Sequence, residues 1–504
     1  MFDEYLKLIL QARVYDVAQE TPLDYAPELS RRFGNEIWLK REDLQSVFSY
    51  KVRGAYNLIA ALTPEQRERG VIAASAGNHA QGVALAARHL GIKALIVMPK
   101  TTPPIKVAAV RRLGAEIITH GNSYNEAAVH ADKLGHGHGM TAVPPFDHPL
   151  VIAGQGTVAM EILRQYQSRL EAIFVPVGGG GLIAGVGAYV KQISPSVKII
   201  GVEHDEAPTM HTALASGERV VLEQVGIFAD GAAVRQVGEE TFRVARECVD
   251  EVLLVTTDEI CAAIKDTFED TRSVLEPAGA LALAGLKQYV VQQALSGKNM
   301  IAICSGANVN FDRLRHIAEL AELGEQREAL LAVTIPERPG SFETLCRALG
   351  ARQITEFNYR YANSADAQVF VGVKLRRGAE DRYALLEQLD AKGYSVVDIS
   401  DNEMAKLHIR YMVGGQTGAV VNEVIYRFEF PERPGALPHF LAELGGRWNI
   451  SLFHYRNHGA AYGHVLAGIQ VPDAERAEVE GLLGKLGMPF WDETENPAYQ
   501  IFLG

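Results

Sequence analysis

The chain has 504 residues, 47% of them hydrophobic and 22% charged, which is enough for two or three globular domains. Its 49 basic and 61 acidic residues leave a net charge of −12, which argues against a nucleic-acid binder with a basic face. The N-terminus has no signal-peptide pattern, and the four cysteines lie far apart without metal-ligand spacing. We therefore expect a cytoplasmic protein with reduced thiols and no metal site.

Residues 36–305 alternate between short apolar runs and longer amphipathic stretches. Buried strands are predicted at residues 70–75, 93–99, 171–177, 197–203 and 299–305. Helices are predicted between several of them, for example at residues 81–91 and 104–114. This alternation is typical of parallel sheets with helices on both faces, in which ligands bind at the carboxyl ends of the strands.

The stretch SYKVRGA places Lys51 where a turn meets a predicted helix. A surface lysine that extends its amine into water is the simpler interpretation of such a residue. A desolvated or cation-flanked lysine is instead a nucleophile, because its pKa falls below the usual value of about 10.4. Phe48, Tyr50 and Arg53 are the neighbours expected to create such surroundings.

The next motif, ASAGNHAQG at residues 74–82, follows a predicted strand and opens a predicted helix. The free N–H groups of a helix N-terminus bind anions, and Ser75, Asn78 and His79 add side-chain donors. The motif therefore suits a small carboxylate. Helix capping by Ser75 or Asn78 alone is the purely structural alternative.

Residues 172–190 carry no charge, yet six glycines and one proline make them a poor membrane helix. They are better interpreted as a strand, a loop of four glycines from Gly178 to Gly181, and a helix. Glycines let backbone N–H groups approach a phosphate closely, and the helix N-terminus adds a favourable partial charge. The loop is therefore predicted to bind a phosphate group.

Spacing alone leaves two interpretations of that phosphate open. Gly179, Gly181 and Ala184 fit the dinucleotide fingerprint, and Glu203 lies about 20 residues further on, where a ribose-binding acid belongs. The other interpretation is pyridoxal phosphate held by Lys51, with Ser305 following a strand at the same sheet edge.

After the last of these strands the pattern changes. Residues 314–331 are predicted as a charged helical connector. Beyond them, PERPG at residues 336–340 recurs at residues 431–435, and ITEFNYR at 354–360 recurs as ISLFHYR at 450–456. Each copy is predicted to fold as strand, helix, two strands, helix and strand, which is the ferredoxin-like plan.

Several of these motifs resemble those of the biosynthetic threonine deaminases (threonine dehydratases), a family of fold-type II pyridoxal-phosphate enzymes. They are SYKVRGA, SAGNHAQG, GGGGL at 178–182, EPAGA at 276–280, SGAN at 305–308 and the tandem C-terminal repeat. The resemblance spans nearly the whole chain. It implies an α/β catalytic domain with parallel sheets and helices on both faces, followed by two ACT-like α+β regulatory domains. The implied boundaries are 1–315 for the catalytic domain, 316–329 for a helical connector, and 330–416 and 424–504 for the regulatory domains.

The resemblance also implies roles for individual residues. Lys51 would hold the cofactor as a Schiff base and then act as the base for the substrate α-proton. The phosphate would lie on Gly178, Gly179, Gly180, Gly181 and Leu182, the ring hydroxyl on Asn78, and the pyridine nitrogen opposite Ser305. The substrate carboxylate would lie among Ser75, Gly77, Asn78 and His79.

Two positions bear on the type of reaction. A neutral serine at Ser305 does not hold the pyridine nitrogen protonated, and the weaker electron sink favours prompt β-elimination. In the similar serine racemases, a serine that acts as an acid stands at the position of Ala76. The resemblance therefore predicts elimination with little racemisation.

The implied reaction converts L-threonine to 2-oxobutanoate and ammonia, the first step of isoleucine biosynthesis, in a homotetramer. Isoleucine would inhibit the enzyme through the regulatory domains, and valine would antagonise isoleucine. Effector contacts are expected at Asn358, Tyr359 and Arg360 in the first repeat and at His454, Tyr455 and Arg456 in the second. The alternative is that these side chains only pack the sheets.

Other functions remain open from the sequence. L-serine or another hydroxyamino acid is an alternative substrate, because one methyl group is worth only about 1–3 kcal/mol of discrimination. A nicotinamide-dependent oxidoreductase rests on the glycine spacing and Glu203, but it leaves Lys51 without a role. A non-catalytic amino-acid sensor rests on the repeat and leaves the site residues unexplained.

Overall fold

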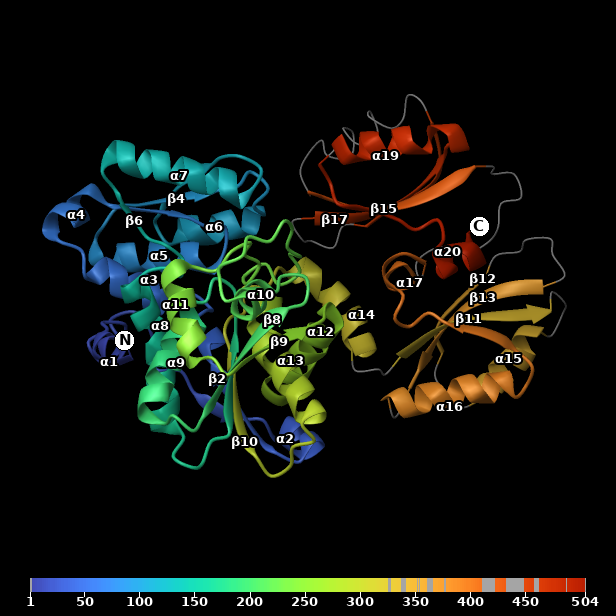
Figure 1. The fold of residues 1–504 in the computed structure, drawn as a ribbon, viewed down its shortest axis with the longest axis horizontal. Coiled ribbons are helices and arrows are strands. Elements are labelled where there is room, and N and C mark those ends of the chain that lie inside the picture. The colour runs from blue at the N-terminus through green and yellow to red at the C-terminus, as the bar shows by residue number, and fades with distance from the viewer. Residues whose placement is uncertain are drawn as a thin grey trace. The chain divides into compact units, whose positions relative to one another are not determined.

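The computed structural model describes residues 2–324, 328–336, 341–350, 352, 354–359, 366–375, 378–409, 422–431, 448–456, 462–485 and 487–503. Contacts divide the chain into two compact units, residues 1–311 and residues 312–504, which we call the N-terminal and C-terminal units (Figure 1).

The larger sheet of the N-terminal unit has the strand order β1-β2-β10-β7-β8-β9. All neighbouring strands are parallel except β1, which pairs antiparallel with β2. The strands are β1 (Leu23–Tyr25), β2 (Glu36–Arg41), β7 (Ala172–Pro176), β8 (Lys198–His204), β9 (Glu251–Val255) and β10 (Asn299–Cys304). The strands predicted at 171–177, 197–203 and 299–305 are confirmed.

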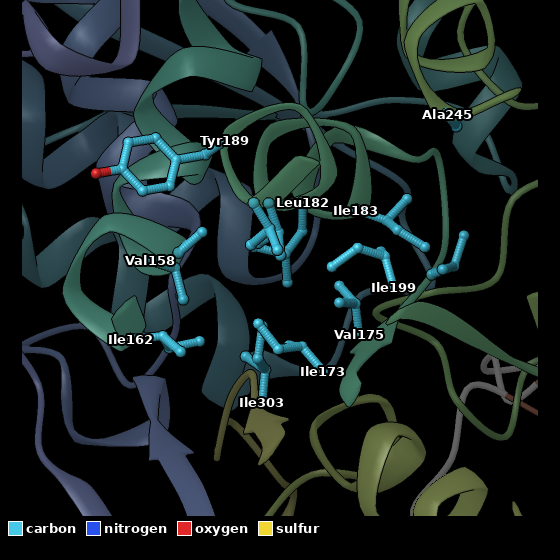
Figure 2. Close-up of a cluster of buried hydrophobic side chains, with 14 of the residues drawn as sticks. Val158, Ile162, Ile173, Val175, Leu182, Ile183, Tyr189, Ile199, Ala245 and Ile303 are labelled. Carbon is cyan, nitrogen blue, oxygen red and sulfur yellow. The ribbon is translucent and has the colours of Figure 1, made fainter. Parts of the chain in front are cut away.

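Helices cover both faces of this sheet. On one face, Ile173, Val175 and Ile199 pack with side chains of α8 (Pro149–Gln165) and α9 (Gly181–Ile193), as Figure 2 shows. On the other face, α13 (Pro277–Gln292) packs against the strands, and its Tyr289 meets Phe174 edge-on with ring centroids 5.5 Å apart. The remaining helices outside the smaller sheet are α1 (Phe2–Leu10), α2 (Pro27–Phe33), α10 (Thr209–Ser216), α11 (Glu239–Cys248) and α12 (Thr257–Thr271).

The smaller sheet is parallel, with the strand order β5-β4-β3-β6. Alternate residues face opposite sides, so Ala73 and Ile96 pack with α3 and α5, whereas Ile72 and Val97 pack with α7. Figure 1 shows α5 and α7 on opposite sides of the sheet. The predicted parallel sheets with helices on both faces are therefore confirmed. The elements are β3 (Val71–Ala74), β4 (Ala94–Met98), β5 (Glu116–Thr119), β6 (Thr141–Ala142), α3 (Lys51–Ala60), α4 (Pro64–Arg69), α5 (Asn78–Leu90), α6 (Pro104–Arg112) and α7 (Tyr124–His138).

Glycines allow α3 and α8 to lie directly against each other. A Cβ on Gly154 would lie 2.7 Å from the Cα of Gly54, and a Cβ on Gly54 would lie 2.8 Å from the carbonyl oxygen of Val151. A larger residue at either glycine would push the helices apart. Because α3 begins at Lys51, this contact sets the position of Lys51 relative to α8.

Each half of the C-terminal unit contains one antiparallel four-stranded sheet, with orders β12-β13-β11-β14 and β16-β17-β15-β18. The first half comprises β11 (Glu328–Pro336), α15 (Ser341–Leu349), β12 (Ile354–Tyr359), β13 (Asp366–Lys374), α16 (Gly378–Asp390), β14 (Ser395–Asp398) and α17 (Glu403–Leu407). The second half comprises β15 (Glu423–Pro431), β16 (Asn449–Arg456), β17 (Tyr462–Gln470), α19 (Arg476–Lys485), β18 (Phe490–Asp492) and α20 (Pro497–Phe502). The first half has the predicted order of elements, and the helix predicted between β15 and β16 lies outside the described residues.

The internal repeat also appears in the hydrogen bonds of the two halves. In the first half, the N–H of Leu330 donates to Ser400 Oγ at 2.9 Å. In the second half, the N–H of Ile425 donates to Thr494 Oγ1 at 3.0 Å. The two copies therefore share the turn that follows their last strand.

Two contacts join the halves of the C-terminal unit. Asn402 Nδ2 donates to Asn496 Oδ1 at 3.0 Å, between the residues that begin α17 and α20. Phe502 of α20 packs edge-on against Phe370 of β13 with ring centroids 5.6 Å apart, and both side chains are buried. The end of the second repeat thus covers part of the sheet of the first repeat.

The connector differs from its prediction. The helix α14 (Leu314–Gly324) ends before β11 begins, so the helix predicted over 314–331 is wrong for its last four residues. Ala329 and Leu331 are buried in the core of the first repeat, and this burial draws the segment into the sheet. Most of each PERPG segment (337–340 and 432–435) lies outside the described residues.

Three cysteines of the described residues, Cys248, Cys261 and Cys304, are buried and not in disulfide bonds. Among the helices that the structure describes, none has both the length and the apolar composition needed to cross a bilayer.

Candidate active site

Lys51 is the first residue of α3, and its amine points into the N-terminal unit. Nζ donates a hydrogen bond to the carbonyl oxygen of Pro145 at 3.1 Å. Part of the side chain remains exposed, but the amine lies deep enough that burial lowers its pKa to about 8, against the opposing effect of the Glu276 charge. An appreciable fraction of the amine is therefore unprotonated and nucleophilic near neutral pH.

The surroundings of Lys51 differ in part from those expected. Tyr50 does face the amine, with Nζ 5.3 Å from its ring centroid, whereas Phe48 is 55% exposed. Arg53 is fully buried and bound to the carboxylates of Glu42 and Glu161. The expectation that Arg53 lowers the Lys51 pKa is wrong, because its charge is neutralised by those carboxylates.

Backbone hydrogen bonds hold the residues before Lys51 against the end of β10. The N–H of Tyr50 donates to the carbonyl oxygen of Ser305 at 3.3 Å, and the N–H of Ala307 donates to the carbonyl oxygen of Phe48 at 2.9 Å. The fold thus brings Lys51 and Ser305 together, although they lie at opposite ends of the unit's sequence.

Ser305 is buried between β10 and the start of α13. Its Oγ donates to the carbonyl oxygen of Ala278 at 3.3 Å. As the donor of that bond, the hydroxyl still has lone pairs and can re-orient toward a ligand atom. Ser305 therefore lies at the carboxyl edge of the larger sheet, where it was predicted.

The glycine loop joins the end of β7 to the start of α9. No backbone N–H from Gly178 to Leu182 donates a hydrogen bond to a residue of the described chain, so five donors are available at a helix N-terminus. A Cβ on Gly179 would overlap the ring of Phe146, so only glycine fits there. Leu182 anchors the loop in the core cluster of Figure 2. The loop is therefore a rigid site for an anion.

Lys51 and this loop line one pocket. The other residues that line it are Tyr50, Phe146, Pro176 and Gly231. The amine suits an aldehyde carbon and the loop amides suit a phosphate, so the residues present fit pyridoxal phosphate.

The SAGNH segment lies at the start of α5, as predicted, and its donors are partly engaged. The N–H of Gly77 donates to Ser75 Oγ at 3.3 Å. Asn78 Nδ2 donates to Glu276 Oε1 at 2.5 Å, and Asn78 Oδ1 accepts from Asn308 Nδ2 at 2.6 Å. Through these two hydrogen bonds, Asn78 connects the start of α5 to the EPAGA segment and to the SGAN segment.

The His79 ring does not serve as a donor to a carboxylate in this arrangement. Burial lowers the pKa of His79 to about 3, with a further effect from the Lys51 charge, so the ring is neutral at working pH. Its Nε2 lies 2.8 Å from the carbonyl oxygen of Val143, which can only accept, so the single N–H is used there. His79 offers a substrate only its backbone N–H.

Glu203 has a structural role. Its carboxylate accepts hydrogen bonds from the N–H groups of Met210 and His211 at 2.8 Å each, at the start of α10. Burial raises the pKa of Glu203 to about 8. A buried carboxylate that caps a helix is not free to bind a ribose, so the main support for a nicotinamide cofactor is lost.

The described residues among those expected to bind effectors lie on β12 and β16, which are edge strands of their sheets. Asn358 and Tyr359 pair with Phe370 and Val369 of β13. His454, Tyr455 and Arg456 pair with equivalent residues of β17, and Arg360 lies outside the described residues. Asn358 and Tyr359 therefore occupy backbone positions equivalent to those of His454 and Tyr455.

Sequence reasoning assigned no role to several residues of the site. Phe146 and Gly231 line the pocket, and Glu276 and Asn308 bind Asn78. Glu276 and Asn308 lie within EPAGA and SGAN, so the motifs were visible, but nothing local indicated their common partner.

Comparisons with known proteins cover both units. A family described as pyridoxal-phosphate dependent enzyme matches residues 14–306. A family described as the C-terminal regulatory domain of threonine dehydratase matches residues 319–409 and 415–503.

Two relatives match nearly the whole of this chain. The biosynthetic L-threonine dehydratase IlvA of Escherichia coli (strain K12) is 55% identical over 500 residues, covering 99% of this chain and 97% of that protein. The mitochondrial threonine dehydratase of Saccharomyces cerevisiae is 52% identical over 514 residues, covering 99% and 89%.

Two solved structures are similar to part of the chain. The processed form of threonine deaminase isoform 2 from Solanum lycopersicum has 50% identity and a TM-score of 0.63, covering 64% of this chain and 88% of that one. Maize serine racemase has 33% identity and a TM-score of 0.58, covering 62% and 95%.

Proposed function

This chain belongs to the family of biosynthetic threonine dehydratases, and on that premise we propose that it converts L-threonine to 2-oxobutanoate and ammonia. It is a threonine ammonia-lyase that depends on pyridoxal phosphate. The observation that carries the proposal is the pocket that Lys51 shares with the glycine loop.

When bound, pyridoxal phosphate supplies an electron sink for the electron pair left on Cα after proton removal. The unprotonated amine of Lys51 takes the α-proton. The bond from Cβ to the hydroxyl then breaks, and the hydroxyl takes up one proton, which balances the proton removed from Cα, and leaves as water. Hydrolysis of the released enamine consumes one water and gives the keto acid and ammonia, so the atoms balance.

The other site residues have the roles of holding and orienting. The N–H groups from Gly178 to Leu182 would hold the phosphate, and Asn78 the ring hydroxyl. Ser305 would face the pyridine nitrogen as a neutral partner, which favours elimination. The substrate carboxylate would meet Ser75, Gly77, Asn78 and the backbone N–H of His79 at the start of α5.

The test is the visible absorbance of the purified protein before and after addition of L-threonine. We expect a band of bound cofactor that changes on mixing while 2-oxobutanoate accumulates, and no band in Lys51→Ala. L-serine is assayed in parallel, since selectivity for threonine belongs to the proposal. A protein without the band after incubation with pyridoxal phosphate would contradict the assignment of Lys51.

We also propose that isoleucine inhibits the enzyme through the C-terminal unit and that valine antagonises isoleucine. The presence of a regulatory region of this family supports small-molecule control. Equivalent edge-strand positions make Tyr359→Ala and Tyr455→Ala a matched pair of variants. A loss of isoleucine inhibition in one variant, with unchanged turnover, would show which repeat binds it, and full inhibition of both would contradict these contacts.

The proposal includes a cytoplasmic homotetramer as the functional assembly. Sedimentation of the holoenzyme with and without isoleucine measures its mass directly, and a monomer under both conditions would overturn the assembly without affecting the reaction.

A further inference from the structure

The Asn78 amide has a fixed orientation. Asn308 Nδ2 donates to two acceptors, the carbonyl oxygen of Val47 at 2.9 Å and Asn78 Oδ1 at 2.6 Å. A backbone carbonyl only accepts, so the Asn308 amide cannot be reversed, and Asn78 must turn its oxygen toward Asn308. The Asn78 NH2 group is therefore directed to Glu276.

Glu276 completes this arrangement from the other side. Oε1 of its carboxyl group accepts one N–H of Asn78 at 2.5 Å. The second N–H of Asn78 makes no hydrogen bond among the described residues. One donor on Asn78 is thus left in a set orientation, which is what recognition of an oxygen on a ligand requires.

The Glu276 carboxylate also borders the pocket. A Cβ on Gly231, which lines the pocket with Lys51, would lie 3.8 Å from Glu276 Oε1 and 3.9 Å from Asn78 Nδ2. Glu276 is 5% exposed and is held by its own N–H, which donates to the carbonyl oxygen of Gly306 at 3.1 Å. A buried negative charge in this place is weakly screened.

Among the described residues, three titratable groups interact with the Lys51 amine: Tyr50 beside it, His79 from α5, and Glu276 from the start of α13. His79 is neutral, as described above, and burial raises the pKa of Tyr50, so its hydroxyl is neutral as well. A negative charge on Glu276 favours a cation at the Lys51 nitrogen.

We propose that Glu276 is a positioning residue of the reaction, which orients Asn78 together with Asn308 and keeps one negative charge beside the Lys51 nitrogen. The inference rests on the proposed function, because Asn78 and Lys51 act there on the cofactor.

The test separates charge from orientation in the holoenzyme. Glu276→Gln keeps the accepting oxygen for Asn78 and removes the charge. Asn308→Ala keeps the charge and releases the Asn78 amide. Asp266→Asn is the matched control, since it removes a buried carboxylate in the same unit that is paired with Arg32 and Lys287 instead.

The measurements are the pH titration of the visible absorbance of bound pyridoxal phosphate and the dissociation constant of the cofactor. In Glu276→Gln we expect the apparent pKa of the bound cofactor to fall by about one pH unit or more, because the anion that favours the protonated nitrogen is gone. In Asn308→Ala we expect weaker cofactor binding with a nearly unchanged titration. Asp266→Asn should titrate like the unmodified protein.

If the bound cofactor has the same apparent pKa in Glu276→Gln as in the unmodified protein, the inference is wrong. If Glu276→Gln does not fold, Glu276→Asp replaces it, and its titration should stay near that of the unmodified protein while its cofactor affinity falls. Absence of the absorbance band from the unmodified protein would overturn the proposed function, which is a distinguishable result.

Discussion

At the scale of single residues, the low pKa of the Lys51 amine has a kinetic consequence. Burial lowers this pKa to about 8, so the nucleophilic form increases as the pH rises through that value. We expect the rate of pyridoxal phosphate capture by cofactor-free protein to rise with pH and to reach half its maximum near pH 8. Stopped-flow absorbance measures it, and a half-maximum near the usual lysine pKa of about 10.4 would show that the amine is not buried.

Gly179 shows how one missing side chain makes room for a ligand. A Cβ there would overlap the ring of Phe146, so Gly179→Ala has to displace the loop amides. Overpacking costs about 1–3 kcal/mol, which predicts a loss of cofactor affinity of roughly 5- to 150-fold. The measurement is a titration with pyridoxal phosphate. Gly137→Ala in α7 is the control, since nothing lies within 4 Å of its added Cβ, and it should bind the cofactor normally.

At the scale of elements, a buried cluster of four charges fixes the start of α3. Arg53 binds Glu42 at 2.7 Å and Glu161 at 2.6 Å, and Lys40 binds Glu161 at 2.6 Å. All four side chains are fully buried, and the two positive and two negative charges cancel. The cluster connects β2, the turn after β2, α3 and α8. Its member on α3, Arg53, lies two residues after Lys51 in the chain.

Removal of one charge from this cluster should destabilise the N-terminal unit. Arg53→Met leaves two carboxylates against one lysine, and unfolding by denaturant should show a loss of about 3–5 kcal/mol. The double variant Arg53→Met, Glu42→Gln restores neutrality and should recover part of that loss. A double variant less stable than Arg53→Met would show that packing by Glu42 matters more than the charge balance.

At the scale of the whole molecule, the chain has one catalytic unit and one unit built from a repeat. Phe502 of the second repeat packs on Phe370 of the first, which makes the two repeats one body. The cofactor is proposed to bind within residues 1–311, and small-molecule effectors are proposed to bind within residues 312–504. Ligands stabilise the unit that binds them.

Truncation of the Phe502 contact should therefore affect the C-terminal unit alone. Phe502→Ala should destabilise that unit by about 3–5 kcal/mol, as for other buried aromatics, while turnover without effector stays unchanged. Hydrogen exchange by mass spectrometry should show faster exchange in peptides of residues 312–504 and unchanged exchange in residues 1–311. Equally faster exchange in both units would contradict local action of the contact, and Phe502→Leu, which keeps most of the volume, serves as control.

Much of the fold and of the site could be predicted from local patterns. The alternation of apolar runs predicts the strands, because burial on both faces requires continuous apolar sequence. Four consecutive glycines before a helix predict an anion site, because the free N–H groups arise from the helix itself. The repeat predicts two similar sheets. The sequence pattern places the motif around Lys51 at the start of a helix. The roles of Lys51 in cofactor binding and proton removal were inferred from the resemblance to a family.

The pairing of residues far apart in the chain was decided by the tertiary structure. The sequence suggested Arg53 as a cation beside Lys51, but in the fold Arg53 forms ion pairs with Glu42 and Glu161. Glu203 lies at the spacing expected of a ribose-binding acid, but in the fold its carboxyl group accepts hydrogen bonds from the N–H groups at the start of α10. Glu276 lies in the EPAGA motif, which did not indicate its partner, and the tertiary structure brings it beside Asn78. Local patterns depend on neighbours a few residues away, whereas pKa values and hydrogen-bond partners depend on which distant segments share a buried volume, and only the packed chain sets that.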